Sequence, residues 1–303
     1  MPPPASTRDL RFLDPAALAR LSSMELKART VVEGFLSGLH RSPFRGFSVE
    51  FAEYRPYLPG DDLSTVDWKV YARTDRHYVK TFEEDTNLDC HLLLDVSASM
   101  GYRGAAPMSK LEYGSVLAGS LAFLMHRQKD ATGLMTFDDR ATFRLPAAAR
   151  RGHLHTLLVA LERARAGGRS DLTRPLRQLA DTLVKRSLVI VISDLLDEPD
   201  PTIRALRQLK CRGTDVIVFQ ILDPHELRFP FDMAATFRDV ESTEAVTADP
   251  DKVRAAYLRE LSAMTLALGR ELRVSGIDYV QLDSSRPLDF ALTAYRAARA
   301  RRA

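Results

Sequence analysis

The chain has 303 residues and a mass of 33.9 kDa, enough for one large domain or two ordinary ones. Hydrophobic residues make up 45% and charged residues 27%, a composition that is typical of folded globular proteins and excludes wholesale disorder. The net charge is +3, but residues 286–303 hold five arginines and one aspartate, which leaves −1 for the rest. The basic pI therefore comes from the C-terminal tail, and we expect no nucleic acid partner, because such binding needs a basic patch on one face.

The two cysteines, Cys90 and Cys211, lie far apart in the sequence. Their number excludes a disulfide framework or a thiolate zinc site, and it favours a compartment in which thiols stay reduced. The N-terminus lacks the apolar core and cleavage site of a signal peptide. No stretch approaches the roughly 18 apolar residues that a membrane span needs. We therefore expect a cytoplasmic protein without a membrane span.

The first quarter of the chain changes character along its length. Residues 1–13 are Pro-rich and polar, and we expect them to be disordered. A helix is expected over 14–39, since Asp14 can cap it before a proline, with a possible break at Ser22 and Ser23. Residues 41–75 mix aromatic and charged side chains with Pro and Gly, which indicates a compact irregular segment with one short helix near 66–72.

After this segment, predicted strands alternate with predicted helices. We expect strands at 77–82, 88–94, 131–137, 188–193, 215–222 and 279–282, with 142–145 as a hairpin partner of 131–137. We expect helices at 110–128, 153–164, 172–184, 201–210, 253–272 and 288–300. Strands separated by helices form right-handed βαβ units, so the predicted fold class is α/β with a doubly wound, mostly parallel sheet.

Oxygen-bearing side chains follow two of these strands and a turn between them. Three lie directly after the strand 88–94, an aspartate follows the strand 188–193, and a glycine-hinged turn at 167–173 carries hydroxyls. Because ligands bind beyond the carboxyl ends of strands in such sheets, we expect these side chains to converge. Their hard oxygen atoms suit Mg²⁺, Mn²⁺ or Ca²⁺ and do not suit zinc. The candidate metal ligands are Asp95, Ser97, Ser99, Ser170 or Thr173, and Asp194.

This constellation resembles the metal-ion-dependent adhesion site of von Willebrand factor A domains, which reads Asp-x-Ser-x-Ser, then a distant Thr, then a distant Asp. Residues 95–99 match the first element and Asp194 matches the last. The middle element departs from the pattern, because the usual Gly-Gly-Thr is Gly-Gly-Arg-Ser at 167–170. The resemblance implies a von Willebrand A-type core and a bound divalent cation, Mg²⁺ in the first place and Mn²⁺ or Ca²⁺ otherwise. It also implies a free coordination position for the carboxylate of a protein partner.

A second resemblance involves the segment before this domain. The ordered signature that begins at Glu50-Phe51 and ends at Phe82-Glu83-Glu84-Asp85 resembles bacterial DUF58 proteins, which place it before a von Willebrand A-type domain. Members of that family are commonly linked with MoxR-type AAA+ ATPases, so the resemblance implies such an ATPase, or its client protein, as the partner. The signature residues either bind a partner or form structural ion pairs; they are Arg55, Tyr57, Asp61, Asp62, Asp67, Trp68, Arg73 and Glu83.

The predicted organisation has four parts. Residues 1–13 are disordered, 14–87 form the signature segment packed on the core, 88–285 form the von Willebrand A-like domain, and 286–303 form a basic C-terminal helix. We expect the arginines at the end of that helix, Arg299 among them, to be solvated, because a helix C-terminus favours cations.

These observations predict an interaction module and not an enzyme. The sequence contains no phosphate-binding P-loop, no dinucleotide-binding glycine motif after a strand and no nucleophile elbow, so we expect no small-molecule substrate. Two alternatives stay open. Asp95 can act as the nucleophile of a Mg²⁺-dependent phosphatase, or the chain can be a scaffold whose metal site is degenerate, since its middle element is altered.

Overall fold

The computed structural model of the chain describes residues 14–40, 54–56, 71, 78–80, 89–183, 187–197, 199–242 and 244–300. It divides the chain into two compact units, one formed by Met1–Gly38 with Leu88–Ala303 and the other by Leu39–Asn87. Within the smaller unit, Tyr54–Pro56 (β1) pairs antiparallel with Tyr78–Lys80 (β2), and β2 lies inside the strand predicted at 77–82. The predicted packing of residues 14–87 on the core stays a prediction.

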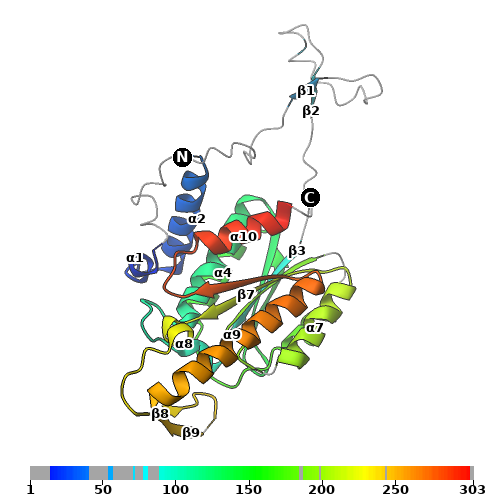
Figure 1. The fold of residues 1–303 in the computed structure, drawn as a ribbon. Coiled ribbons are helices and arrows are strands. Elements are labelled where there is room, and N and C mark those ends of the chain that lie inside the picture. Colours follow the sequence, from blue (N-terminus) through cyan, green and yellow to red (C-terminus); the bar gives the residue numbers. More distant parts are fainter. Residues whose placement is uncertain are drawn as a thin grey trace. The chain divides into compact units, whose positions relative to one another are not determined.

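The larger unit is built on a six-stranded sheet (Figure 1). Its strands are Asp89–Asp95 (β3), Ala131–Phe137 (β4), Ala141–Ala148 (β5), Ser187–Ser193 (β6), Asp215–Leu222 (β7) and Asp278–Asp283 (β10). Their order across the sheet is β10-β7-β6-β3-β4-β5, and every neighbouring pair is parallel except the hairpin of β4 and β5. Counted along the chain, this is the doubly wound order 3-2-1-4-5-6. The predicted α/β fold class is confirmed.

Helices cover both faces of this sheet. Lys110–Arg127 (α4), His153–Arg163 (α5) and Asp289–Ala300 (α10) pack on one face, and Thr173–Ala180 (α6), Pro199–Cys211 (α7) and Pro250–Val274 (α9) pack on the other. Pro15–Ala19 (α1) and Met24–His40 (α2) precede the sheet in sequence, and Ala28 of α2 approaches Gly119 of α4. Across the described residues, no helix combines the length and the apolar character needed to cross a bilayer.

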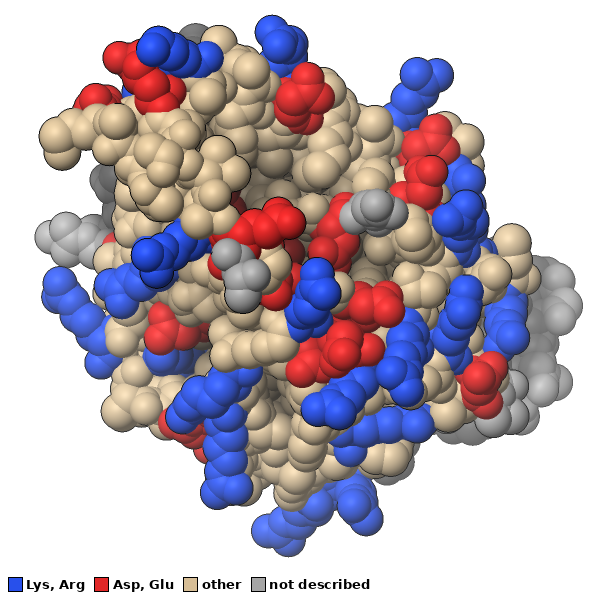
Figure 2. Space-filling model, turned by 90° about the horizontal axis from the view of Figure 1, so that it is seen from below, with Lys and Arg blue, Asp and Glu red and all other residues tan. Residues whose placement is uncertain are grey.

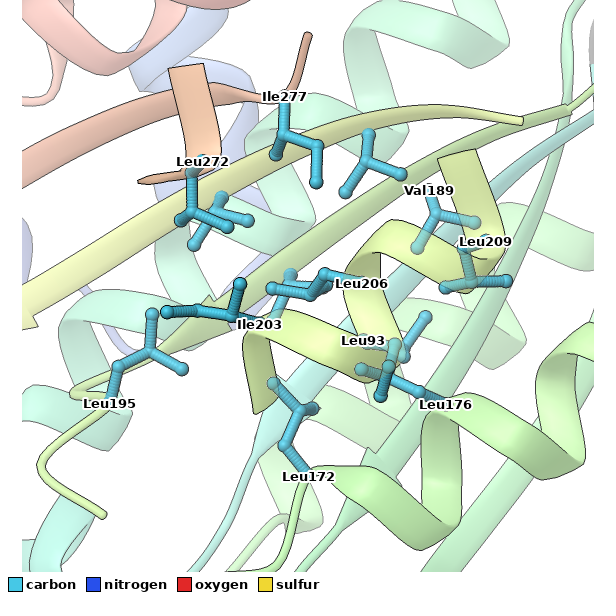
Figure 3. Close-up of a cluster of buried hydrophobic side chains, with 14 of the residues drawn as sticks. Leu93, Leu172, Leu176, Val189, Leu195, Ile203, Leu206, Leu209, Leu272 and Ile277 are labelled. Carbon is cyan, nitrogen blue, oxygen red and sulfur yellow. The ribbon is translucent and has the colours of Figure 1, made fainter. Parts of the chain in front are cut away.

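The strands are buried on both faces, which explains their nearly continuous apolar sequences. Leu93 and Val189 point toward α6 and α7, where they meet Leu176 and Leu206 in one apolar cluster (Figure 3). On the opposite face, α4 lies so close to the sheet that a Cβ atom on Gly114 would be 3.1–3.2 Å from side chains of β3, β6 and β7. Burial of this kind contributes about 25 cal/mol per Å² of apolar surface.

Most predicted elements agree with the structure, with differences at their ends. The possible break in the first helix is real, since α1 ends at Ala19 and α2 begins at Met24. The Asp14 side chain caps α1 by accepting the N–H of Ala16 at 3.1 Å. Helix α6 ends at Ala180, short of the predicted 184, and Asp181 is its C-cap.

Besides β1, which lies in the segment expected to be irregular, four elements have no counterpart in the sequence prediction. They are the 3₁₀ turn Ala98–Gly101 (η3), the short helix Pro224–Arg228 (α8), and the antiparallel strands Ala235–Arg238 (β8) and Ala245–Ala248 (β9). The strands β8 and β9 form a hairpin between α8 and α9. They are short and mostly exposed, so they lack the buried alternation by which strands are recognised in a sequence.

The end of the C-terminal helix differs from the prediction in one residue. Leu292 and Tyr295 of α10 are buried, and the helix is part of the core. Arg299 is not a solvated helix end, because its guanidinium donates to the Gln128 side chain at 2.8 Å and to the Asp130 carboxylate. The expectation of solvation was wrong here because Asp130, which follows α4, supplies a buried negative charge beside α10.

Candidate functional site

The carboxyl ends of β3 and β6 are the position that the topology favours for a ligand. The connections from these adjacent strands go to opposite faces of the sheet, since α4 follows β3 on one face and α7 follows β6 on the other. The divergence opens a crevice beyond the strand ends. Asp95 is the last residue of β3, and Asp194 directly follows the last residue of β6.

Asp95 lies at the centre of the oxygen cluster and is fully buried. One of its carboxylate oxygens accepts the N–H of Ser97 at 2.8 Å. The other accepts the hydroxyl of Ser193 at 2.6 Å and that of Ser170 at 3.3 Å. The hydroxyls of Ser97 and Ser99 are 3.1 Å apart. The structure therefore brings the Asp-x-Ser-x-Ser loop, the end of β6 and the glycine turn to one point.

The glycine turn is held against the Asp-x-Ser-x-Ser loop by its backbone. Gly167 donates its N–H to the Val96 carbonyl at 2.8 Å, and the Gly168 carbonyl accepts the N–H of Ala98 at 3.0 Å. Gly168 has φ +77°, and a Cβ there would be 2.7 Å from the carboxylate of Asp138, so only glycine fits. This packing places Ser170 beside Asp95.

Of the two hydroxyls left open by the sequence, Ser170 is the one in contact with Asp95. Thr173 is the first residue of α6, and its backbone N–H donates to Asp171 at 2.8 Å. Asp171 thus serves the helix start, where a carboxylate is favoured.

Asp194 is buried and is paired with a lysine that the sequence analysis did not single out. The ammonium of Lys110, which is 0% exposed, donates to Asp194 at 2.7 Å and to Glu226 of α8 at 2.6 Å. Burial lowers the pKa of Lys110, but the two carboxylates outweigh it and the pKa is raised, so the lysine is charged. One oxygen of Asp194 is thereby committed to Lys110, which leaves the other for a cation or its water.

Glu241 completes the site from an unexpected direction. It lies in the connection between β8 and β9, and its carboxylate accepts the N–H of Ser99 at 3.2 Å and that of Ser170 at 2.9 Å. Both donors belong to candidate metal ligands. No feature of the sequence pairs Glu241 with them, since the contacts arise only when the hairpin folds over the sheet edge.

The site carries more negative than positive charge. Burial and the charge of Asp194 raise the pKa of Asp95 to about 7, against hydrogen bonds from Ser193 and Ser97 that favour ionisation. Burial also raises the pKa of Asp197 to about 6, against a hydrogen bond from Ser170 and with the charges of Glu241 and Asp194 adding to the rise. Both pKa values are raised by burial and by neighbouring negative charge. A bound cation would offset these effects by stabilising the ionised carboxylates.

The donor set fits a hard divalent cation better than a thiolate- or imidazole-bound metal. Among the described residues, no three His, Cys, Asp or Glu side chains are grouped as metal ligands. A cation here would thus depend on serine hydroxyls as well as on Asp95, the kind of oxygen environment that suits Mg²⁺ with retained waters.

The signature residues of the smaller unit fall mainly outside the described part. Arg55 lies in β1, opposite Val79 of β2. The others, Tyr57, Asp61, Asp62, Asp67, Trp68, Arg73 and Glu83, lie outside the described residues. Their assignment to partner binding or to structural ion pairs stays a prediction.

The class of protein is therefore a doubly wound α/β domain with an oxygen-lined site at its topological switch point. The chain belongs to the DUF58 family, whose model, described as a protein of unknown function, matches residues 53–265. Two uncharacterized proteins, from Mycobacterium tuberculosis and Mycobacterium bovis, are each 30% identical over 278 residues, which cover 90% of this chain and 86% of theirs.

Solved structures with some similarity have low identity. The conserved hypothetical protein BatB from Bacteroides thetaiotaomicron is 15% identical with a TM-score of 0.47, covering 70% of this chain and 98% of that one. An aerotolerance-related membrane protein from Bacteroides fragilis is 19% identical with a TM-score of 0.48, with the same coverage. The SpRpn10 VWA domain is 17% identical with a TM-score of 0.32, covering 44% and 75%. At scores this low, the strand order alone defines the fold class.

Proposed function

We propose that the chain is a metal-dependent protein–protein interaction module. One observation carries the proposal: buried carboxylates and serine hydroxyls from three loops meet at the switch point, and their charge is only partly balanced by Lys110. Asp95, Ser97, Ser99 and Ser170 would hold a divalent cation, Mg²⁺ in the first place, with Asp194 acting directly or through water. Thr173 is the alternative to Ser170 as the middle ligand.

Each side chain has a distinct part in this proposal. Asp95 supplies the negative charge, and the hydrogen bond from the Ser97 N–H fixes its orientation. The hydroxyls of Ser97, Ser99 and Ser170 supply neutral oxygen atoms. A bound cation would add positive charge and a coordination position that a partner's carboxylate can take. Since the ligands are mostly neutral, the cation would keep a strong attraction for that carboxylate.

The partner that we propose is a MoxR-type AAA+ ATPase or its client, in line with the family resemblance, and the chain would act as its cytoplasmic adaptor. We propose a non-enzymatic role for this site, and a Mg²⁺-dependent phosphatase with Asp95 as its nucleophile is the alternative to be tested.

Capture of a purified MoxR-type ATPase from the same organism tests the proposal. We expect the wild-type chain to bind the ATPase in Mg²⁺ and to lose it in chelator. Asp95→Ala should lose binding in either condition, while Asp139→Ala, which removes an exposed carboxylate from the neighbouring β4–β5 turn, should bind as the wild type does.

Three outcomes would contradict the proposal in different ways. Binding that is unchanged by chelator and by Asp95→Ala points to a scaffold with a degenerate metal site. Mg²⁺-dependent turnover of a phosphate ester that is lost in Asp95→Asn points to the phosphatase. If the chain fails to capture the ATPase under every condition, the ATPase is not its partner.

A further inference from the structure

The tip of the β8–β9 hairpin lies over the candidate cation site. Glu241 reaches from this tip to the backbone N–H groups of Ser99 and Ser170, so that one carboxylate bridges the two loops that carry the proposed ligands. Ser97 and Asp95 are buried beneath, while Ser99, Ser170 and Glu241 are only half-buried. The carboxylate of Glu241 thus lies on the open side of the site, which is the side from which a partner must approach.

We propose that Glu241 is an internal substitute for the partner's carboxylate, so that the hairpin tip closes the site until an acidic segment of the partner displaces it. This inference rests on the proposed function and adds to it both a closed state and the chemistry of the ligand. The partner would present a Glu or Asp side chain whose oxygen atoms accept the same two N–H groups.

The hydrogen bonds show why one carboxylate excludes another. Each oxygen of Glu241 takes one N–H, from Ser99 on one side and Ser170 on the other. An incoming carboxylate can use these donors only after Glu241 has left. Charge acts in the same direction, because Glu241 and Asp197 would repel a second carboxylate.

The hairpin is built to open without unfolding the domain. Its strands are anchored by Phe237 of β8, which stacks on Phe229 at 5.4 Å and meets Phe231 edge-on at 5.2 Å. Beyond this anchor, β9 is mostly exposed and pairs only with β8. A two-stranded ribbon with so little buried surface has low local stability. The connection at 239–244 can therefore move away from the site while the aromatic contacts of Phe237 stay in place.

The surface around the tip fits an acidic ligand that comes with a cation. Figure 2 views the side on which β8 and β9 lie in Figure 1, and it shows acidic side chains gathered near the centre with lysines and arginines around them. Arg169 is one of the exposed basic residues; the pKa of Asp239, at the base of the tip, is lowered mainly by the hydrogen bond from Ser242 and to a smaller extent by the charge of Arg169. A basic rim steers an acidic segment, while the acidic centre admits it only when a cation is bound.

A peptide made from the chain's own tip tests this inference in the full-length protein. The probe is a labelled peptide of residues 235–248, titrated in Mg²⁺ against the wild type and Glu241→Ala. We expect the variant to bind it at least about tenfold more tightly, because the wild-type tip competes as an intramolecular ligand. Glu244→Ala is the matched control, since Glu244 lies in the same connection, is exposed and should leave the wild-type affinity unchanged.

The remaining measurements distinguish a failure of this inference from a failure of the proposed function. A peptide carrying Glu241→Gln should not bind, and the protein variant Glu241→Gln, which keeps the side chain's shape, should give an intermediate affinity. Equal affinities of the wild type and both Glu241 variants, with bound Mn²⁺ still detected by electron paramagnetic resonance, overturn the internal substitute but leave the metal site. Tight binding to Glu241→Ala that persists in chelator supports the docked tip and rejects the metal mechanism.

Discussion

Lys110 shows how a single residue sets the charge of the site. Its ammonium is enclosed by Asp194 and Glu226 and is fully buried, so both carboxylates depend on it for compensation. A buried ion pair is costly to break from one side, because the partner charges then remain without compensation. Lys110 therefore acts as a fixed internal cation that permits two acidic side chains beneath the proposed metal.

We predict that Lys110→Met lowers the free energy of unfolding by about 3–5 kcal/mol at neutral pH. Urea denaturation in chelator measures this. Adding Glu226→Gln to the variant should recover part of the loss, since one of the two uncompensated charges is then removed. Lys252→Met is the control, because Lys252 is exposed and its pairing with Asp249 is worth at most about 1 kcal/mol. Equal effects of the two lysine variants would contradict the role given to Lys110.

At the scale of the elements, the sequence predicted those whose side chains are buried in a regular pattern. The strands β4 and β7 have the predicted bounds, because each is a short apolar run that ends at a polar turn. The Asp-x-Ser-x-Ser loop and Asp194 were also found, since the carboxyl ends of adjacent parallel strands must meet.

The parts that the sequence analysis missed depend on tertiary contacts. The hairpin of β8 and β9 is exposed, so no hydrophobic period marks it. Glu241 meets Ser99 and Ser170 only through that hairpin. A weak signal existed for Lys110, since it is a cation at the first position of a helix, where the dipole disfavours it. Its partners Asp194 and Glu226 come from other elements and explain the exception.

At the antiparallel edge of the sheet, the backbone of β5 approaches Gly133 of β4 closely. The pairing of β4 with β5 shifts register between Thr132 and Leu134, and a Cβ on Gly133 would lie 2.8 Å from the Ala147 nitrogen and 2.9 Å from the Leu145 oxygen. These are backbone atoms, which cannot move aside without disturbing β5.

Gly133→Ala should therefore lower the free energy of unfolding by about 1–3 kcal/mol, as overpacking does. Gly167→Ala is the matched control, because a Cβ there meets nothing within 4 Å and should change stability by less than about 0.5 kcal/mol. Thermal unfolding monitored by circular dichroism compares the two. If Gly133→Ala is as stable as the wild type, the strand pairing at this shift is wrong.

At the scale of the whole molecule, the site links the two layers of helices. Its ligands come from the loop after β3, from the turn before α6 and from the end of β6, and Lys110 belongs to α4 on the other face. Protons and cations that bind here should therefore change the stability of the entire larger unit. Asp95 is the group whose protonation should make this stability depend on pH.

The direction in which stability changes with pH follows from the raised pKa of Asp95. Its folded-state pKa is about 7 and its ordinary value is 3.8, so the folded state holds this proton more tightly. The stabilising contribution is complete below the ordinary value and is lost as the pH rises through about 7. In chelator, Asp95→Asn should lack this loss and exceed the wild type in stability at pH 8 by a few kcal/mol, since each pKa unit corresponds to about 1.4 kcal/mol. At pH 4 the two should be nearly equal.

A divalent cation should narrow this difference at high pH. Mg²⁺ competes with the proton for Asp95, so it should raise the unfolding midpoint of the wild type more at pH 8 than at pH 6. At a hundredfold excess over its dissociation constant, the gain is about 2.7 kcal/mol. Asp95→Asn should gain little, and Asp139→Ala, which keeps the site, should respond as the wild type does. If Mg²⁺ shifts the midpoints of the wild type and Asp95→Asn equally at both pH values, the ion binds elsewhere on the chain.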